Sequence, residues 1–166
     1  MTLVIGVDPG KTGAIARWDS AVRSLTIVDM PLSDKKLCVD ELSICVMTLI
    51  SSFKVLPVAY IEKVGGIGTQ SASRSFEFGF VTGAVHGVMS ANGLILKTVT
   101  PQKWKAAMGL KRELGESTAD FKTRSRILAV KLCPEGADMF KRAKDDGRAE
   151  AFLIAYYGAA IENGNQ

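Results

Sequence analysis

Short apolar runs separated by polar turns fill the first part of the chain. The run Leu3–Val7 is rich in β-branched residues and stops at Pro9-Gly10, a pattern that predicts a buried strand. Apolar residues over Thr12–Trp18 and Ser24–Val28 predict two further strands. Because the connections between these strands are short, the three are expected to form an antiparallel meander.

The next part of the chain alternates between helical and strand patterns. Apolar positions recur at helical spacing over Lys36–Phe53 and again from Ser71 to Asn92-Gly93, which predicts two helices. Compact apolar runs at Val58–Ile61 and Leu94–Val99 predict two interior strands. Strands separated by a helix can pair in parallel, so these two are expected to extend the meander as parallel strands.

The last third of the chain is mainly helical in pattern. A short helix is expected over Lys103–Met108, a polar and basic loop over Lys111–Thr118, and longer helices over Ala119–Leu132 and Asp146–Ile161. The whole order of elements predicts a single α/β domain over residues 1–166. Its mixed five-stranded sheet, with three antiparallel and two parallel strands, is expected to be flanked by helices.

Composition narrows the class of protein. Apolar residues make up 47% of the 166 residues, enough for a full core without disulfides. The three cysteines form no CxxC pair, and no stretch approaches the ~18 apolar residues of a membrane span, so a cytoplasmic protein is expected. Between Lys97 and Arg148, 13 Lys and Arg residues stand against 7 Asp and Glu residues. This half of the chain is therefore expected to face a polyanion such as a nucleic acid.

Carboxylates stand where strands and helices would converge. Asp8 directly follows the first strand, and Glu62 ends the fourth. If these strands are parallel neighbours, the two acids meet at one edge of the sheet. Asp146 and Glu150 are spaced i, i+4 and share one face of the last helix. Four converging carboxylates would repel one another, whereas hard divalent cations such as Mg²⁺ prefer oxygen ligands and remove that cost.

Two other motif assignments are conceivable for the stretch around Asp8. Gly10-Lys11-Thr12 looks like the end of a phosphate-binding P-loop, but only three residues separate Gly6 from Gly10 where that loop needs four. A kinase of the actin-like type would need a second domain, for which 166 residues do not suffice.

Asp145, beside Asp146, lies about 140° from Glu150 around the helix, so it is expected to serve as an N-cap instead of joining the site.

Five motifs in chain order resemble the RuvC-type Holliday junction resolvases of the ribonuclease H-like superfamily, and more closely their phage and prophage branch. Together the motifs span almost the whole chain: Ile5–Gly10, Tyr60–Glu62, Ser75–Gly79, Val99–Lys105 and Asp146–Ala151. One departure concerns the last helix, where cellular members carry two Asp at i, i+3 and this chain has Asp146 and Glu150 at i, i+4.

The resemblance implies a ribonuclease H-like fold and a metal-dependent endodeoxyribonuclease. Such an enzyme cuts four-way junctions and other branched DNA, leaves 5′-phosphate and 3′-hydroxyl ends, and works in the cytoplasm of a bacterial host. Two Mg²⁺ ions, which Mn²⁺ can replace, would activate a water and stabilise the leaving oxygen. Asp8 would bridge the two ions, Glu62 and Asp146 would each bind one, and Glu150 would complete the site or stand behind it.

The partners expected from this resemblance are branched DNA and a second copy of the chain, with no membrane and no small-molecule cofactor. Basic side chains would contact DNA phosphates without reading bases; these are Lys111, Arg112, Lys122 and Arg124. A junction presents two symmetric strands, so a homodimer is expected. The row Gly79, Gly83 and Gly87, with Phe76 and Phe80, offers a helix face for that contact, unless the row packs within the fold.

Two other functions share these features. A ribonuclease H-like enzyme acting on RNA–DNA hybrids would use the same acids. A non-catalytic DNA-binding relative would keep the basic half of the chain and could lose an acid, but all four acids are present here.

Overall fold

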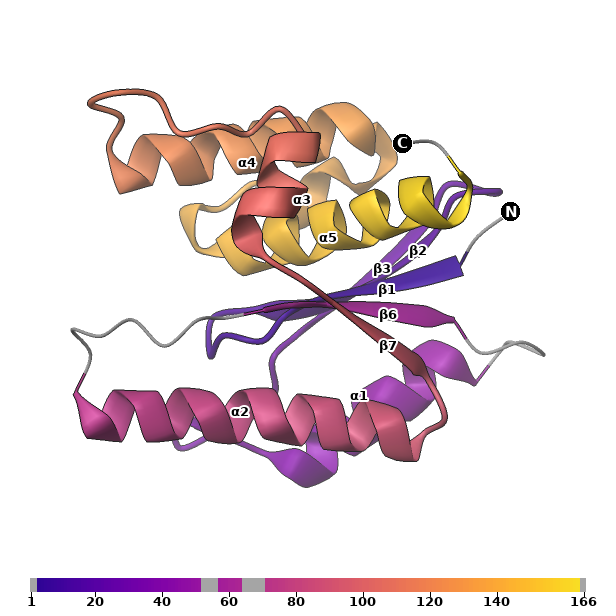
Figure 1. The fold of residues 1–166 in the computed structure, drawn as a ribbon. Coiled ribbons are helices and arrows are strands. Elements are labelled where there is room, and N and C mark those ends of the chain that lie inside the picture. The colour runs from indigo at the N-terminus through magenta and orange to yellow at the C-terminus, as the bar shows by residue number, and fades with distance from the viewer. Residues whose placement is uncertain (1–2, 52–56, 64–70, 165–166) are drawn as a thin grey trace.

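Five strands form one mixed sheet in the order β3-β2-β1-β6-β7 (Figure 1). The computed structural model describes residues 3–51, 57–63 and 71–164. The strands are β1 Leu3–Asp8, β2 Ala14–Asp19, β3 Ser24–Asp29, β6 Val58–Glu62 and β7 Ile95–Val99. β1, β2 and β3 pair antiparallel, whereas β1 pairs with β6 and β6 with β7 in parallel. The predicted mixed five-stranded sheet is thus confirmed.

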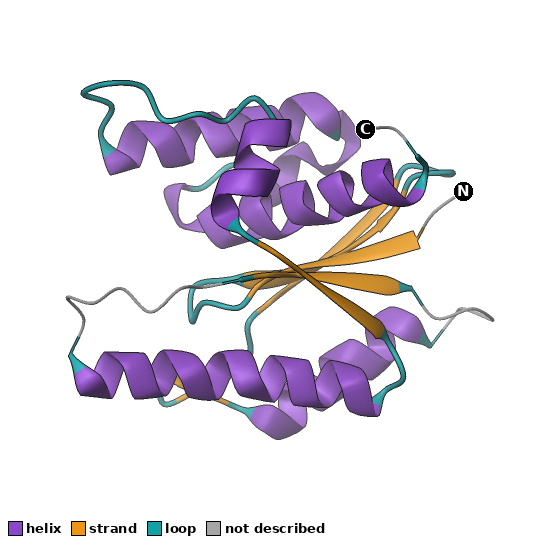
Figure 2. Ribbon diagram, viewed as in Figure 1, coloured by secondary structure: helices purple, strands orange, loops and turns teal. Residues whose placement is uncertain are grey.

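Helices cover both faces of the sheet (Figures 1 and 2). On one face lie α1 Val39–Ile50 and α2 Ala72–Ala91, and on the other lie α3 Pro101–Ala107, α4 Thr118–Leu132 and α5 Asp146–Glu162. Two 3-10 helices, η1 Pro134–Phe140 and η2 Ala143–Asp145, connect α4 to α5. Each face has its own apolar core, one centred on α5 and the other on α1 and α2. No helix within the described residues is both long and apolar enough to cross a membrane.

The structure differs from the sequence prediction in three places. Lys36 and Leu37 were expected to begin a helix, but they form strand β5, which pairs with β4 Leu32–Ser33. Asp34 and Lys35 between these strands have φ of 48° and 61°, the backbone of a tight hairpin turn, so α1 begins only at Val39. The predicted helix end at Phe53 lies outside the described residues.

The other two differences concern the second half of the chain. β7 was predicted as an interior strand, but it lies at the edge of the sheet, and Ile95 is exposed. Of its apolar residues, Val99 packs into the core on the α5 side and Leu96 against the core of α1 and α2. The two 3-10 helices between Pro134 and Asp145 were not predicted, because each is too short to show a helical period.

α5 crosses β1 in direct backbone contact. A side chain at Gly6 would overlap the carbonyl oxygen of Ala151 and the backbone of Ala155, and one at Gly147 would overlap the carbonyl oxygen of Thr12. Only glycine permits this approach at both points. The first turns of α5 therefore lie against the β1–β2 turn, beside the end of β1.

Candidate active site

Two acids lie side by side where parallel strands end. Asp8 ends β1 and Glu62 ends β6, and the register pairs Val7 with Ile61, one residue before each acid. The Asp8 carboxylate accepts a hydrogen bond from the backbone N–H of Gly10 at 3.1 Å. The first glycine after the strand therefore orients this acid at the sheet edge.

Glu62 is buried and is held by α3. The indole Nε1 of Trp104 donates a hydrogen bond to Glu62 Oε1 at 2.8 Å. Burial raises the pKa of Glu62, the Trp104 hydrogen bond lowers it, and the charge of Glu150 raises it further. Trp104 is fully buried, as expected for a residue that anchors α3, and it also fixes the orientation of an acid.

Glu150 and Lys105 form a partly buried ion pair. Lys105, the residue after Trp104, brings its Nζ to 3.0 Å from Glu150 Oε1. Adjacent residues of α3 thus each bind one acid of the site. No role was predicted for Lys105, although it lies in the motif Val99–Lys105. The sequence signal that could have suggested a role for Lys105 is its place directly after a tryptophan that was expected to anchor the helix.

Asp8 has a strongly raised pKa. Burial, followed by the charges of Glu150 and Glu62, raises the pKa of Asp8 to about 7, against a smaller lowering by Gly10 and Lys105. The shift shows that the three carboxylates lie close enough to repel one another. One ammonium group does not neutralise them.

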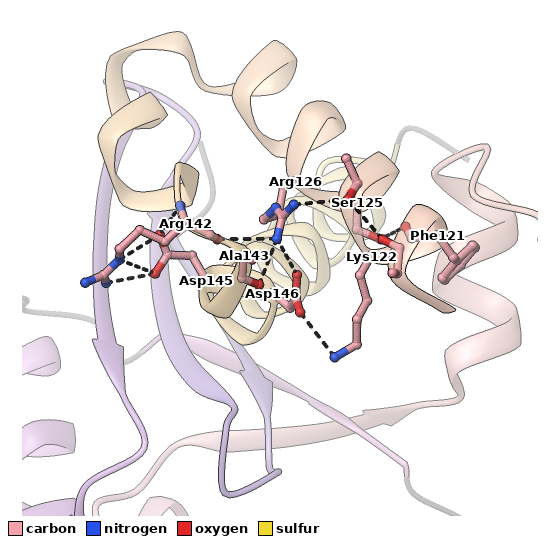
Figure 3. A network of polar contacts seen from close by, with 10 residues as sticks. Phe121, Lys122, Ser125, Arg126, Arg142, Ala143, Asp145 and Asp146 are labelled. Atoms are coloured by element: carbon pink, nitrogen blue, oxygen red, sulfur yellow. Dashed lines mark hydrogen bonds and ion pairs between the residues drawn. The ribbon is translucent and has the colours of Figure 1, made fainter. Parts of the chain in front are cut away.

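Asp146 contacts basic side chains of α4 (Figure 3). Its Oδ1 accepts a hydrogen bond from Arg126 Nη1 at 3.0 Å, and its Oδ2 pairs with Lys122 Nζ at 3.1 Å, both from α4. The four predicted acids are therefore divided. Asp8, Glu62 and Glu150 interact with one another, whereas the two oxygens of Asp146 contact basic side chains.

The donor set fits hard divalent cations. Among the described residues, no three His, Cys, Asp or Glu side chains are close enough together to form a ready-made metal site. All the candidate donors are carboxylate oxygens, the ligands that Mg²⁺ and Mn²⁺ prefer. The raised pKa of Asp8 shows that added positive charge would be favourable beside Glu62 and Glu150.

Asp145 does not cap α5 with its side chain. It is buried and occupies the N-cap position of α5, but its carboxylate makes no hydrogen bond to that helix. The Asp145 carboxylate instead accepts hydrogen bonds from Arg142. The backbone N of Arg142 lies 2.8 Å from Oδ2, and its side-chain Nη2 lies 2.8 Å from Oδ1. Burial raises the pKa of Asp145, but the Arg142 hydrogen bonds outweigh it and the net pKa is lowered. Asp145 therefore occupies the predicted N-cap position, but its side chain closes the preceding 3-10 turn instead of capping α5.

The predicted DNA-contacting residues lie around the α3–α4 loop and along α4. Arg124 Nη1 contacts Glu116 Oε1 at 2.9 Å and the carbonyl oxygen of Lys111 at 3.2 Å, and Arg112 Nη2 donates to Thr118 Oγ1 at 2.8 Å. These two arginines therefore brace the loop. The side chain of Lys111 is exposed beside them.

A surface groove of about 420 Å³ adjoins this loop. Lys105, Lys111 and Arg112 line it together with Leu110 and Phe121. Since Lys105 also contacts Glu150, the groove lies next to the acids. The three cationic side chains of this otherwise mainly apolar groove suit a polyanion.

Comparison with known proteins gives matches among solved structures alone. No protein-family model and no curated protein sequence matches the chain. Thermus thermophilus RuvC in complex with a Holliday junction substrate superposes with a TM-score of 0.68 at 16% identity, over 99% of this chain and 98% of that one. A second Thermus thermophilus RuvC structure gives 0.59 at 16% identity, over 97% of each chain.

The yeast mitochondrial Holliday junction resolvase Ydc2 is a more distant neighbour. Its TM-score is 0.52 at 14% identity, over 99% of this chain and 82% of that one. At sequence identities this low, structural similarity is evidence for a shared fold and for nothing beyond it. The chain therefore has the ribonuclease H-like fold that RuvC displays, with a mixed five-stranded sheet between two helical layers.

Proposed function

We propose that this protein is a metal-dependent endodeoxyribonuclease that cleaves four-way junctions and other branched DNA. The observation that carries the proposal is the group Asp8, Glu62 and Glu150 at the edge of the two parallel strands, where burial and then the charges of Glu150 and Glu62 raise the pKa of Asp8. The likeness to RuvC over nearly the whole chain supports it, since one of those structures holds a Holliday junction substrate. The five sequence motifs favour the phage and prophage branch, and hence the cytoplasm of a bacterial host.

The acids have distinct tasks in this proposal. Asp8, Glu62, Glu150 and Asp146 would hold two Mg²⁺ or Mn²⁺ ions, which when bound activate water and stabilise the leaving 3′-oxygen. Trp104 keeps Glu62 in place, and Lys105 balances the charge of Glu150. Asp8 has a pKa of about 7, so it must give up a proton to bind a cation. Metal affinity is therefore expected to fall as the pH drops below 7.

The basic surface would hold the DNA backbone. Lys111 and Lys122 offer exposed or half-exposed ammonium groups, and Arg112 and Arg124 shape the loop beside them. Contacts of this kind fix the position of DNA without reading its sequence. We therefore assign the affinity for branched DNA to this surface and the chemistry to the acids.

A homodimer forms part of the proposal. A side chain built at Gly79, Gly83 or Gly87 would meet no atom within 4 Å, so this row does not pack within the described part of the fold. On the same helix, Phe76 is 77% exposed and Phe80 is 51% exposed. This exposed face suits a two-fold contact between identical helices.

We expect Phe80→Glu to convert the dimer to a monomer. A charge in an apolar interface must be desolvated, which costs several kcal/mol. Light scattering would measure the mass, and Ile127→Glu on α4, where Ile127 is 62% exposed, serves as the matched control. A wild-type protein that is monomeric and still resolves junctions fully would contradict the dimer.

Substitutions of the adjacent acids Asp145 and Asp146 should have different effects on cleavage. Asp146→Asn is expected to abolish cleavage while junction binding persists, because only Asp146 shares a face of α5 with Glu150. Asp145→Asn should still cut, but it weakens charged hydrogen bonds from Arg142 and should cost roughly 1–3 kcal/mol of stability. Cleavage assays and urea denaturation measure the two effects. An inactive Asp145→Asn beside an active Asp146→Asn would show that the wrong acid had been assigned.

A panel of substrates tests the function itself. Labelled four-way junction, flap, linear duplex and RNA–DNA hybrid would be incubated with the protein in Mg²⁺ or Mn²⁺. The proposal predicts cleavage of branched DNA in preference to duplex and hybrid. Preferred cutting of the hybrid would indicate a ribonuclease H activity, and binding to junctions without cleavage would indicate the non-catalytic relative.

A further inference from the structure

Two cations of α4 hold Asp146 in different ways (Figure 3). Arg126 binds one carboxylate oxygen and Lys122 binds the other, at 3.0 and 3.1 Å. The arginine side chain is 16% exposed, whereas the lysine side chain is 47% exposed. The same acid therefore has one sheltered partner and one partner in contact with solvent.

Arg126 is anchored at several points. Its Nη1 donates to the carbonyl oxygen of Ala143 at 2.7 Å and to that of Arg142 at 3.3 Å, and its Nη2 donates to Thr123 Oγ1 at 3.1 Å. A planar guanidinium with this many acceptors has little freedom to turn away. It joins α4 to the chain segment that leads into α5, and with that segment it fixes Asp146.

Lys122 has a weaker hold on Asp146. The contact that the described residues provide for its ammonium group is the single ion pair with Oδ2. An ion pair with a partner this exposed is weak, so it exchanges readily. A DNA backbone, by contrast, concentrates negative charge and releases counter-ions when lysines bind it.

We propose that Arg126 is a positioning residue for Asp146, and that Lys122 is an exchangeable counter-ion that leaves Asp146 for a phosphate when branched DNA binds. The inference rests on the proposed function. In the free protein Lys122 covers Oδ2, and in the DNA complex that oxygen is released toward the other acids. Binding of DNA and binding of a divalent cation then reinforce each other by the same factor.

A double-mutant cycle in EDTA tests the exchange without any cleavage. Affinity for a four-way junction would be measured for wild type, Asp146→Asn, Lys122→Met and the double variant. Asp146→Asn frees Lys122, so it should tighten binding several-fold when Lys122 is present, and at least threefold less in the Lys122→Met background. In a Lys131→Met background, which removes an exposed lysine from the last turn of α4, the full effect of Asp146→Asn should remain.

Two results of this cycle have separate meanings. An equal effect of Asp146→Asn with and without Lys122 would overturn the exchange and leave the proposed function standing. Failure of the wild type to bind any branched DNA would instead contradict the proposed function.

Metal affinity of the DNA-free protein tests the division of roles. In a Mn²⁺ titration followed by electron paramagnetic resonance, Lys122→Met should raise the affinity several-fold, because Oδ2 loses a competing cation. Arg126→Gln should lower the affinity, because Asp146 loses its support. Arg126→Lys keeps the charge and should show a smaller decrease, which provides a test should Arg126→Gln fail to fold. A change of the same sign at positions 122 and 126 would refute the proposal.

Discussion

Asp8→Asn is expected to abolish cleavage and at the same time to stabilise the metal-free protein above pH 7. Burial and the charges of Glu150 and Glu62 raise the pKa of Asp8 from 3.8 to about 7 in the folded state. Between these pH values the folded protein holds a proton that the unfolded chain has lost. The stability of the metal-free protein must therefore fall as the pH rises from about 4 to about 7.

The size of this effect follows from the shift. One pKa unit corresponds to about 1.4 kcal/mol, so the ionised Asp8 costs up to ~4 kcal/mol at pH 8. Asparagine cannot ionise, and it should remove most of that cost together with the main candidate for a metal ligand. Urea denaturation in EDTA at pH 5 and pH 8 measures the stability, and junction cleavage in Mg²⁺ measures the activity.

Asp19→Asn is the matched control for this variant. Asp19 also ends a strand of the same sheet, but its carboxylate accepts a hydrogen bond in the exposed β2–β3 turn. This variant should cut junctions and keep the pH dependence of the wild type. An Asp8→Asn protein that cuts DNA, or whose stability changes with pH as the wild type's does, would be incompatible with the site described above.

Gly6→Ala is expected to destabilise the protein by about 3 kcal/mol or more, because its methyl group would overlap the backbone of α5 at Ala151 and Ala155. Neither backbone can move without separating α5 from β1. The same separation would carry Asp146 and Glu150 away from Asp8, so any folded fraction should also cut poorly. Urea denaturation and junction cleavage of the one variant would show both losses.

Gly79→Ala is the control for the glycine substitution. Its methyl group would meet nothing within 4 Å in the middle of α2. In the single chain, without the proposed dimer contact, alanine there should gain up to ~1 kcal/mol of helix propensity. Wild-type stability of Gly6→Ala would mean that α5 does not cross β1 in contact with it.

The strands could be predicted from sequence because their apolar runs are compact and end at Pro or Gly. The adjacency of Asp8 and Glu62 followed from one further assumption, that β1 and β6 pair in parallel, and the register confirms it. The β4–β5 hairpin was missed because Leu37 fits a helical period equally well. Whether a strand such as β7 is interior depends on how many strands the sheet has, which its own residues do not encode.

The partners of the acids were harder to predict. Trp104 was expected to anchor its helix, but its hydrogen bond to Glu62 joins residues 42 positions apart. The contacts of Asp146 with Lys122 and Arg126 likewise depend on how α4 packs against the start of α5. Periodicity within one element cannot reveal such pairs. A carboxylate at a strand end can therefore be identified from sequence, whereas its counter-ion requires the fold.

The measurement that most directly tests the central claim is cleavage of a four-way junction with each of its four strands labelled in turn, in Mg²⁺ and in EDTA. The account predicts nicks in two opposed strands in Mg²⁺, with 5′-phosphate ends that ligase can reseal, and no product in EDTA. Undiminished cutting in EDTA would contradict the metal-dependent mechanism, and an intact junction in both Mg²⁺ and Mn²⁺ would contradict the proposed function.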